Sequence, residues 1–248
     1  MKLLTSYSAT FFLYILFIPT YIFSQSELLN EQYYNSFDSF TTYYNIEVFN
    51  GKEHIDIYSE FKKGNHKFYH SDDFLLGSVF YNDQPYYDLN MKYDLLNDFL
   101  LLGYKNQKIS YLRLNEDFVH EFSLDGDKFV RLLENPQLDG FYRNGFFKEV
   151  YKGNNYMFYI KYLKSKTARS RDKKIYYVFD DQSIYILFYK NYYFRINKIK
   201  DVIKILPQNK DQVQKFYTNY RKLYKKDREQ FLEKLFKNLE NLGAFNIN

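Results

Sequence analysis

Hydrophobic and polar residues alternate with a period of two through the middle of the stretch from Gly77 to Leu102. The apolar set is Tyr87, Leu89, Met91 and Tyr93, and the polar set is Asp88, Asn90, Lys92 and Asp94. Such alternation is typical of a strand with one buried and one solvated face. Turn-forming residues at 82–85 and 97–98 predict three consecutive antiparallel strands here. We expect the polar set to be solvated and the apolar set to form either the core or the wall of a ligand cavity.

Strand patterns continue on both sides of this stretch. Asn50-Gly51 separates alternating residues at 44–48 from Ile55 and Ile57, which predicts a hairpin, and 60–73 looks like a loop. Later strands are expected at 108–114, 118–124, 129–133, 145–151, 156–163, 174–179, 184–189 and 192–196. Residues 164–173 form a polar excursion between strands, and 180–183 form a turn. About a dozen strands joined by short turns predict a strongly curved antiparallel sheet, as a sandwich or an open barrel.

From Asn197 onwards the apolar spacing becomes helical. Asn197 is the expected cap of a first helix that Pro207 ends, a second helix is expected around 213–220, and Asp227 caps a third. The apolar stripe of the third helix is Leu232, Leu235, Leu239 and Leu242. We expect this stripe to pack on the sheet, with a partner protein or a membrane surface as the alternative. The fold class is therefore α+β: a β domain at 25–196 and C-terminal helices at 197–248 in one globular unit.

The first 24 residues have the pattern of a signal peptide. Lys2 precedes the apolar run 11–18, and Pro19 lies ahead of the small residue Ser24, after which we expect cleavage. An uncleaved membrane anchor is the alternative, because 3–23 just reaches spanning length. We therefore predict that the protein is exported and is periplasmic, associated with the outer membrane, or secreted.

Several phrases of the sequence resemble a family of secreted, β-rich Bacteroidota proteins without an established activity. The phrases are 77–81, Tyr93-Asp94 with Asp98 and Leu100, 122–124, 129–132, 145–153 and 192–194 before the Lys-rich tail. This resemblance spans most of the mature chain. It implies export across the inner membrane of a Gram-negative cell, and it brings no catalytic residues with it.

The amino-acid composition excludes several kinds of functional site. The chain has no cysteine, which excludes disulfides, thiolate metal sites and a cysteine nucleophile. Its net charge of +5 is mild and falls short of the concentrated basic surface of a nucleic-acid-binding protein. Tyrosine (29) and phenylalanine (26) are abundant, through either codon bias or an aromatic binding surface.

Candidate site chemistry is sparse. His66, His70 and Asp72 share a face if their stretch is extended and are then weak candidates for metal ligands. The favoured interpretation is an exposed loop that uses these polar residues as turn formers, and we predict neither a metal site nor a cofactor. Carboxylate pairs lie at 72–73, 116–117 and 180–181. A glycosidase-type hydrolase needs two carboxylates that converge across a cleft, and the sequence assigns no catalytic residue.

A dense basic run begins near the end of the predicted strand at 156–163 and continues beyond it. It consists of Lys161, Lys164, Lys166, Arg169, Arg171, Lys173 and Lys174. We expect a solvated hairpin tip, whose functional version would contact lipopolysaccharide, phospholipid headgroups or a polyanionic glycan. An envelope protein is a further possible partner, whereas nucleic acid is not expected. The sequence favours a non-enzymatic structural or interaction module. The alternative is a half-barrel carrier of a lipid or other hydrophobic ligand, and a carboxylate-dependent hydrolase ranks third.

Overall fold

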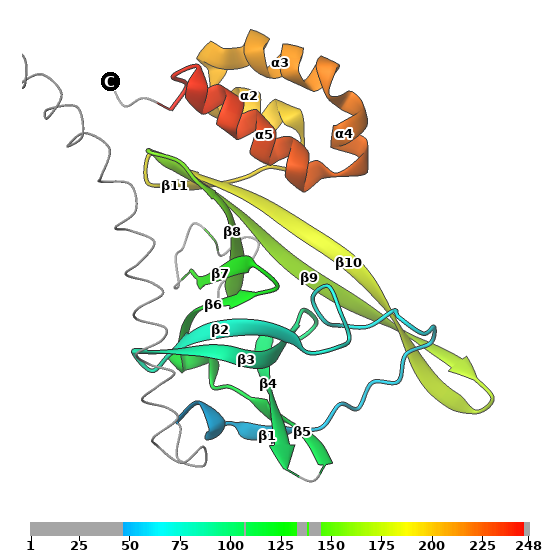
Figure 1. The fold of residues 1–248 in the computed structure, drawn as a ribbon. Coiled ribbons are helices and arrows are strands. Elements are labelled where there is room, and N and C mark those ends of the chain that lie inside the picture. The colour runs from blue at the N-terminus through cyan, green and yellow to red at the C-terminus, as the bar shows by residue number, and fades with distance from the viewer. Residues whose placement is uncertain (1–46, 107, 133–137, 139–144, 246–248) are drawn as a thin grey trace, which may run out of the picture. The chain divides into compact units, whose positions relative to one another are not determined.

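The computed structural model describes residues 47–106, 108–132, 138 and 145–245, and the predicted signal peptide lies outside them. Its strands form a single antiparallel sheet that is not closed (Figure 1). The strands are β1 (Lys52–His54), β2 (Leu75–Tyr81), β3 (Gln84–Asp94), β4 (Phe99–Asn106), β5 (Lys108–Arg113), β6 (Val119–Leu124), β7 (Asp127–Arg131), β8 (Phe146–Lys152), β9 (Tyr156–Arg171), β10 (Lys174–Tyr189) and β11 (Tyr192–Arg195). The helices are α2 (Ile199–Ile205), α3 (Lys210–Asn219), α4 (Arg221–Lys226) and α5 (Arg228–Asn241), with 3₁₀ turns at Glu47–Phe49, Glu116–Phe118 and Pro207–Asn209. The predicted α+β class is confirmed.

The spatial order of the strands is β1-β5-β4-β3-β2-β6-β7-β8-β9-β10-β11. Most neighbours are consecutive in the chain, as a meander requires, and only the β1–β5 and β2–β6 pairs among the described strands join more distant segments. Gly77 lies in the β2–β6 pair, where a Cβ would come within 2.2 Å of the Ser123 carbonyl oxygen. The close approach of these two strands therefore requires glycine at this position.

Three of the expected connections between strands are wrong. Asn50-Gly51 does not close a hairpin, because β1 begins at Lys52 and pairs with β5 instead. Ile55 and Ile57 follow β1 outside any strand, and each is 74% exposed. At the other end of the sheet, β9 and β10 pair without interruption from Tyr156 with Tyr189 to Arg171 with Lys174. The expected polar excursion at 164–173 and the expected turn at 180–183 are therefore parts of one long hairpin.

The C-terminal helices cover the β8–β11 end of the sheet (Figure 1). Asp227 caps α5 by accepting a hydrogen bond from the Gln230 backbone N–H, as predicted. The buried residues of α5 are Phe231, Leu232, Leu235, Phe236 and Leu239, which pack on Phe158, Ile160 and Leu187 of the sheet. Leu242 is the C-cap just after α5 and is 55% exposed, so its place in the apolar stripe was predicted wrongly. Asn197 is not the cap of α2, which begins after Lys198.

The apolar set of β3 belongs to the core in its second half. Met91 and Tyr93 have no exposed surface, whereas Leu89 is half-buried. The Tyr93 ring contacts the edges and faces of three further rings, those of Phe122, Phe129 and Phe146. The alternation alone could not distinguish a core from the wall of a ligand cavity. The packed rings around Tyr93 show that this part of the face is core. None of the helices among the described residues has both the length and the apolar character that spanning a membrane requires.

Candidate functional site

The polar face of β3 is covered at its C-terminal end by residues 55–73, which we call the covering segment. β2 begins only at Leu75, so the edge of β3 beyond Met91 is left for the covering segment to pair with. There the Tyr69 N–H donates to the Tyr93 carbonyl (2.9 Å), and the Leu95 N–H donates to the Lys67 carbonyl (3.0 Å). Asn90 is exposed as expected, but Lys92 and Asp94 are 6% and 0% exposed. The prediction of a solvated face is wrong for these two residues, because a distant segment lies over them.

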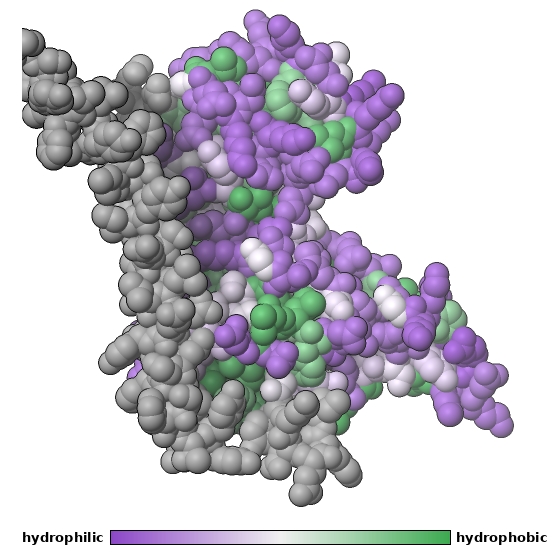
Figure 2. Space-filling model, viewed as in Figure 1, coloured by the Kyte–Doolittle hydropathy of each residue, from purple (hydrophilic) through white to green (hydrophobic). Residues whose placement is uncertain are grey.

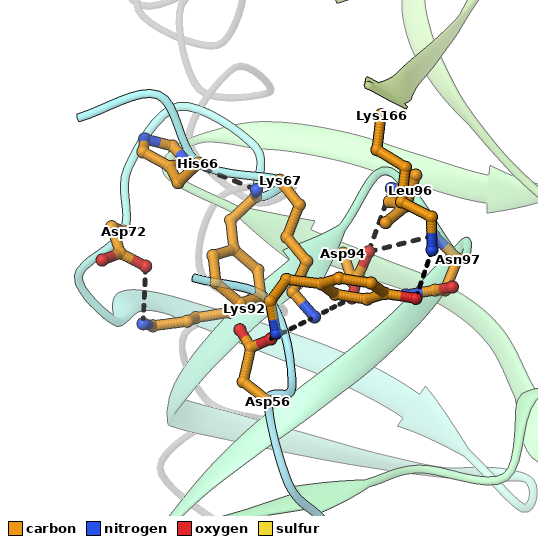
Figure 3. A network of polar contacts seen from close by, with 11 residues as sticks. Asp56, His66, Lys67, Asp72, Lys92, Asp94, Leu96, Asn97 and Lys166 are labelled. Carbon is orange, nitrogen blue, oxygen red and sulfur yellow. Dashed lines mark hydrogen bonds and ion pairs between the residues drawn. The ribbon is translucent and has the colours of Figure 1, made fainter. Parts of the chain in front are cut away.

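Lys67 and Asp94 form a buried ion pair at the centre of this region (Figure 3). The Lys67 Nζ lies 2.8 Å from Asp94 Oδ2 and 3.3 Å from Asp56 Oδ1, and Lys67 is only 2% exposed. Besides this ion pair, Asp94 accepts three hydrogen bonds, from the backbone N–H groups of Leu96 (2.9 Å) and Asn97 (3.0 Å) and from the Asn97 side chain (3.0 Å). The carboxylate thus ties the covering segment to β3 and also shapes the turn into β4. Burial of both charges is tolerable because each has an opposite charge beside it.

Lys92 is held mainly by aromatic rings. Its Nζ lies 4.7 Å from the Phe68 ring centre, 5.0 Å from that of Phe74 and 5.3 Å from that of Tyr111. Its carboxylate partner is Asp72, at 3.4 Å and 58% exposed. Cation–π contacts of this kind stabilise a partly desolvated ammonium group.

A cavity of about 230 Å³ opens beside these pairs. It is lined by Asp56, Tyr58, Glu60, His66, Lys67, Phe68, Asp72, Tyr111 and Phe179. His66 Nδ1 accepts a hydrogen bond from the Phe68 N–H, and burial together with the nearby Lys164 ammonium lowers the pKa of the imidazole. Burial raises the pKa of the Tyr111 hydroxyl. At neutral pH the lining therefore combines a neutral imidazole and a neutral phenol with carboxylates and one buried ammonium.

Lys161 is a third buried cation, on the core side of the sheet. Its Nζ donates to Asp98 Oδ1, to the Tyr93 hydroxyl (3.2 Å) and to the Phe146 carbonyl (2.9 Å). Burial lowers the pKa of Lys161 to about 8, although the Asp98 carboxylate acts in the opposite direction. Lys161 has no exposed surface, so the prediction that it contacts an anionic surface is wrong.

The other six members of the basic run lie on the outer part of the β9–β10 hairpin, residues 164–181, which we call the arm. Lys164 is 10% exposed and partnered by Asp181 (3.4 Å) and the His66 carbonyl (2.6 Å). The exposed cations are Lys166, Arg169, Arg171, Lys173 and Lys174, and none of them pairs with a carboxylate of the described residues. Figure 2 shows mainly hydrophilic residues over the arm. A solvated hairpin tip was expected here, although the tip is longer than the sequence suggested.

Two features give the arm its shape. Asp172 and Lys173 form a tight turn with φ values of 53° and 60°, the left-handed pair that two-residue hairpins require. The covering segment pairs with the free edge of β10 at Tyr177. The Phe61 N–H donates to the Tyr177 carbonyl (2.8 Å), and the Tyr177 N–H donates to the Ser59 carbonyl (2.8 Å). The Arg171 guanidinium lies 5.2 Å from the Phe61 ring centre and 4.9 Å from that of Tyr176.

The candidate metal ligands are divided between two places. His66 and Asp72 line the cavity, whereas His70 pairs with Asp125 at 3.2 Å and stacks on Tyr69. Within the described ranges, no group of three or more His, Asp and Glu side chains is arranged to hold a metal ion.

The carboxylate pairs do not converge either. Glu116 and Asp117 pair with Arg113 and Arg131, and Asp181 pairs with Lys164. Asp72 is the one member of the three pairs that lines the described cavity. The carboxylates that join it there are Asp56 and Glu60, which sequence reasoning missed because they lie in an irregular segment without a motif.

Comparison with known proteins gave no match to a family model, to a curated protein or to a solved structure.

Proposed function

We propose that this protein is an exported, non-enzymatic interaction module of the cell envelope, and that its arm binds an anionic glycan. The observation that carries the proposal is the set of exposed cations on the arm that lack carboxylate partners among the described residues. Export is supported by the signal-peptide pattern of residues 1–24.

The cations of the arm cost stability where they stand. Arg171 and Lys174 are directly opposite each other in the β9–β10 register, and like charges in that position repel. Arg169 lies on the same face, two residues before Arg171, so three positive charges gather near the tip. Residues 166–174 contain five basic side chains and one acidic side chain, Asp172. A bound polyanion would relieve this repulsion.

A hydrated polyanion fits the arm better than a membrane does. Ile175 is the large apolar residue of the arm that stands exposed, at 63%, and insertion into a bilayer requires more apolar surface than one side chain offers. From Lys164 to Arg171 the strand extends about 25 Å, over which cations recur. Such spacing suits a linear chain of anionic sugars. The packed aromatic cluster around Tyr93 favours this interaction module over the half-barrel carrier.

The test compares two variants that lose the same charge. Arg169, Arg171 and Lys174 are changed to glutamine in the first, and the exposed Lys200, Lys204 and Lys210 in the control. Binding to dextran sulfate, neutral dextran and vesicles containing phosphatidylglycerol is measured by biolayer interferometry at low salt. At about 1 kcal/mol per cation, the arm variant should bind dextran sulfate about 100-fold more weakly, and the control should bind nearly as well as the wild type.

Two results would contradict the proposal. One is equal weakening in both triple variants, which would indicate a general charge effect. The other is binding to the vesicles without binding to dextran sulfate, which would assign the arm to a lipid surface.

A further inference from the structure

The cavity beside Lys67 does not use the exposed cations of the arm. It lies where the covering segment meets β5, through Tyr111, and β10, through Phe179. Its volume of about 230 Å³ is below the roughly 300–1,000 Å³ of pockets that bind drug-sized molecules. An occupant must therefore be small, of the size of a single substituted ring.

One buried nitrogen in the cavity wall has incomplete hydrogen bonding. Lys67 Nζ has two carboxylates within ion-pair distance, yet it makes no hydrogen bond of acceptable geometry with any described residue. An ammonium group carries three N–H donors, and a buried donor without an acceptor is costly. An oxygen atom of a ligand in the cavity would supply a missing acceptor.

The charges of the cavity favour a neutral ligand. Lys67 is shared by Asp94 and Asp56, and Asp72 is beside Lys92. Glu60 has no cationic partner among the described residues, so the wall carries an excess of carboxylates. A cationic ligand would meet the Lys67 ammonium, which lines the cavity and faces the Phe68 ring at 5.1 Å. An anionic ligand would meet the carboxylates of the wall. The three wall carboxylates disfavour an anion most, and a neutral ligand avoids both kinds of repulsion.

We propose that this cavity binds one neutral pyranose ring, either as a free sugar or as the end of a glycan. Each sugar hydroxyl both donates and accepts, which matches a wall that offers the Lys67 ammonium as a donor and the carboxylates of Asp56, Glu60 and Asp72 as acceptors. Tyr58, Phe68, Tyr111 and Phe179 supply the apolar part of the lining. Walls that combine aromatic rings with a few convergent polar groups are typical of small-molecule sites.

Saturation-transfer NMR on the mature chain tests this inference. The probes are glucose, galactose, mannose and N-acetylglucosamine, each as the free sugar and as its methyl glycoside. Transfer to at least one free sugar is expected, and retention with its methyl glycoside would identify the end of a glycan as the source. Loss of binding with the methyl glycoside would identify a free sugar.

A matched pair of variants locates the binding. Asp72→Asn changes a carboxylate of the cavity wall, whereas Asp73→Asn changes its exposed neighbour outside the wall. Because hydrogen bonds to charged groups are the stronger ones, Asp72→Asn should weaken the sugar at least about tenfold, and Asp73→Asn should leave it unchanged. If Asp72→Asn does not fold, Glu60→Gln replaces it, since its amide oxygen still accepts from the Gly64 N–H.

Three results would overturn the inference: no transfer to any of the probes, unchanged affinity in the folded wall variant, or equal loss in Asp73→Asn. The triple variant of the arm should bind the sugar normally. Failure of the arm proposal and failure of the cavity proposal are therefore distinguishable.

Discussion

Replacing Lys67 with methionine should lower the free energy of unfolding by about 3 kcal/mol. Removing one partner of a buried ion pair costs about 3–5 kcal/mol, because the remaining charge is left buried without compensation. Here the remaining charge is Asp94, which has no exposed surface and lay 2.8 Å from the removed ammonium. The cost falls at the lower end because Asp94 keeps the hydrogen bonds from Leu96 and Asn97. Methionine keeps most of the length of the lysine stem, so little packing is lost.

The complementary variant, Asp94→Ala, should cost more, about 5 kcal/mol. It leaves Lys67 with Asp56 alone and also removes the acceptor that shapes the turn into β4. In the double variant Lys67→Met/Asp94→Ala, the loss should be well below the sum of the single losses, since neither charge is then left alone. This asymmetry and this coupling are specific to a carboxylate that serves both an ion pair and a turn.

Urea unfolding followed by tyrosine fluorescence and circular dichroism measures these differences, with the exposed Lys63→Met as the control. For a chain of this size, a loss of about 3 kcal/mol corresponds to a fall of roughly 6–12 °C in Tm. Lys67→Met within 1 kcal/mol of wild type (about the size of an exposed ion pair), or additive losses in the double variant, would refute the reasoning.

Two further predictions concern the core. The free energy of unfolding of the wild type should rise by up to about 2 kcal/mol as the pH rises from about 8 to about 9.5. The reason is that Lys161 has a pKa of about 8 in the folded protein and near 10.5 in the unfolded chain. In this range the unfolded chain binds the proton more strongly, so raising the pH favours the folded state. Urea midpoints across this range should show no such rise in Lys161→Met, and an equal rise there would assign the effect to other groups. Leu235→Ala should cost about 3 kcal/mol in urea unfolding, because Leu235 is fully buried between α5 and the sheet. Leu242→Ala is the control, at 55% exposure, and equal losses would show that α5 does not dock as described.

The meander could be predicted from the sequence because its strands are half-buried and its turns are short. Alternation around Met91 and turn residues such as Asn82-Asp83 both report on local structure, and that is where the prediction succeeded. The same reasoning failed to predict most of the arm. The strand at 174–179 was predicted, but both faces of the arm meet solvent near the tip, so no apolar period marks 164–171. Asp180-Asp181 also has turn-like composition in the middle of β10.

The cavity could not be predicted, for a different reason. Lys92 and Asp94 occupy the polar positions of an alternating strand, and such positions are normally solvated. They are buried only because the covering segment pairs with the end of β3, a contact between residues about 25 positions apart that no local pattern encodes. Lys161 was wrongly predicted to be exposed for a similar reason. It lies within a basic run, and no local pattern indicates that its partner is the distant Asp98.

The topology of the sheet has a consequence for how the chain acquires its structure. Two runs of consecutive hairpins, β2–β5 and β6–β11, can each form from sequence-local pairings, and the β2–β6 ladder then joins them. Low contact order within each run should make those hairpins fast, whereas closing the loop that holds β3–β5 should make the joining step the kinetic bottleneck. Pulse-labelling hydrogen exchange during refolding should therefore find the amides shared by β2 and β6 protected last, with Gly77 at the point where the two halves meet.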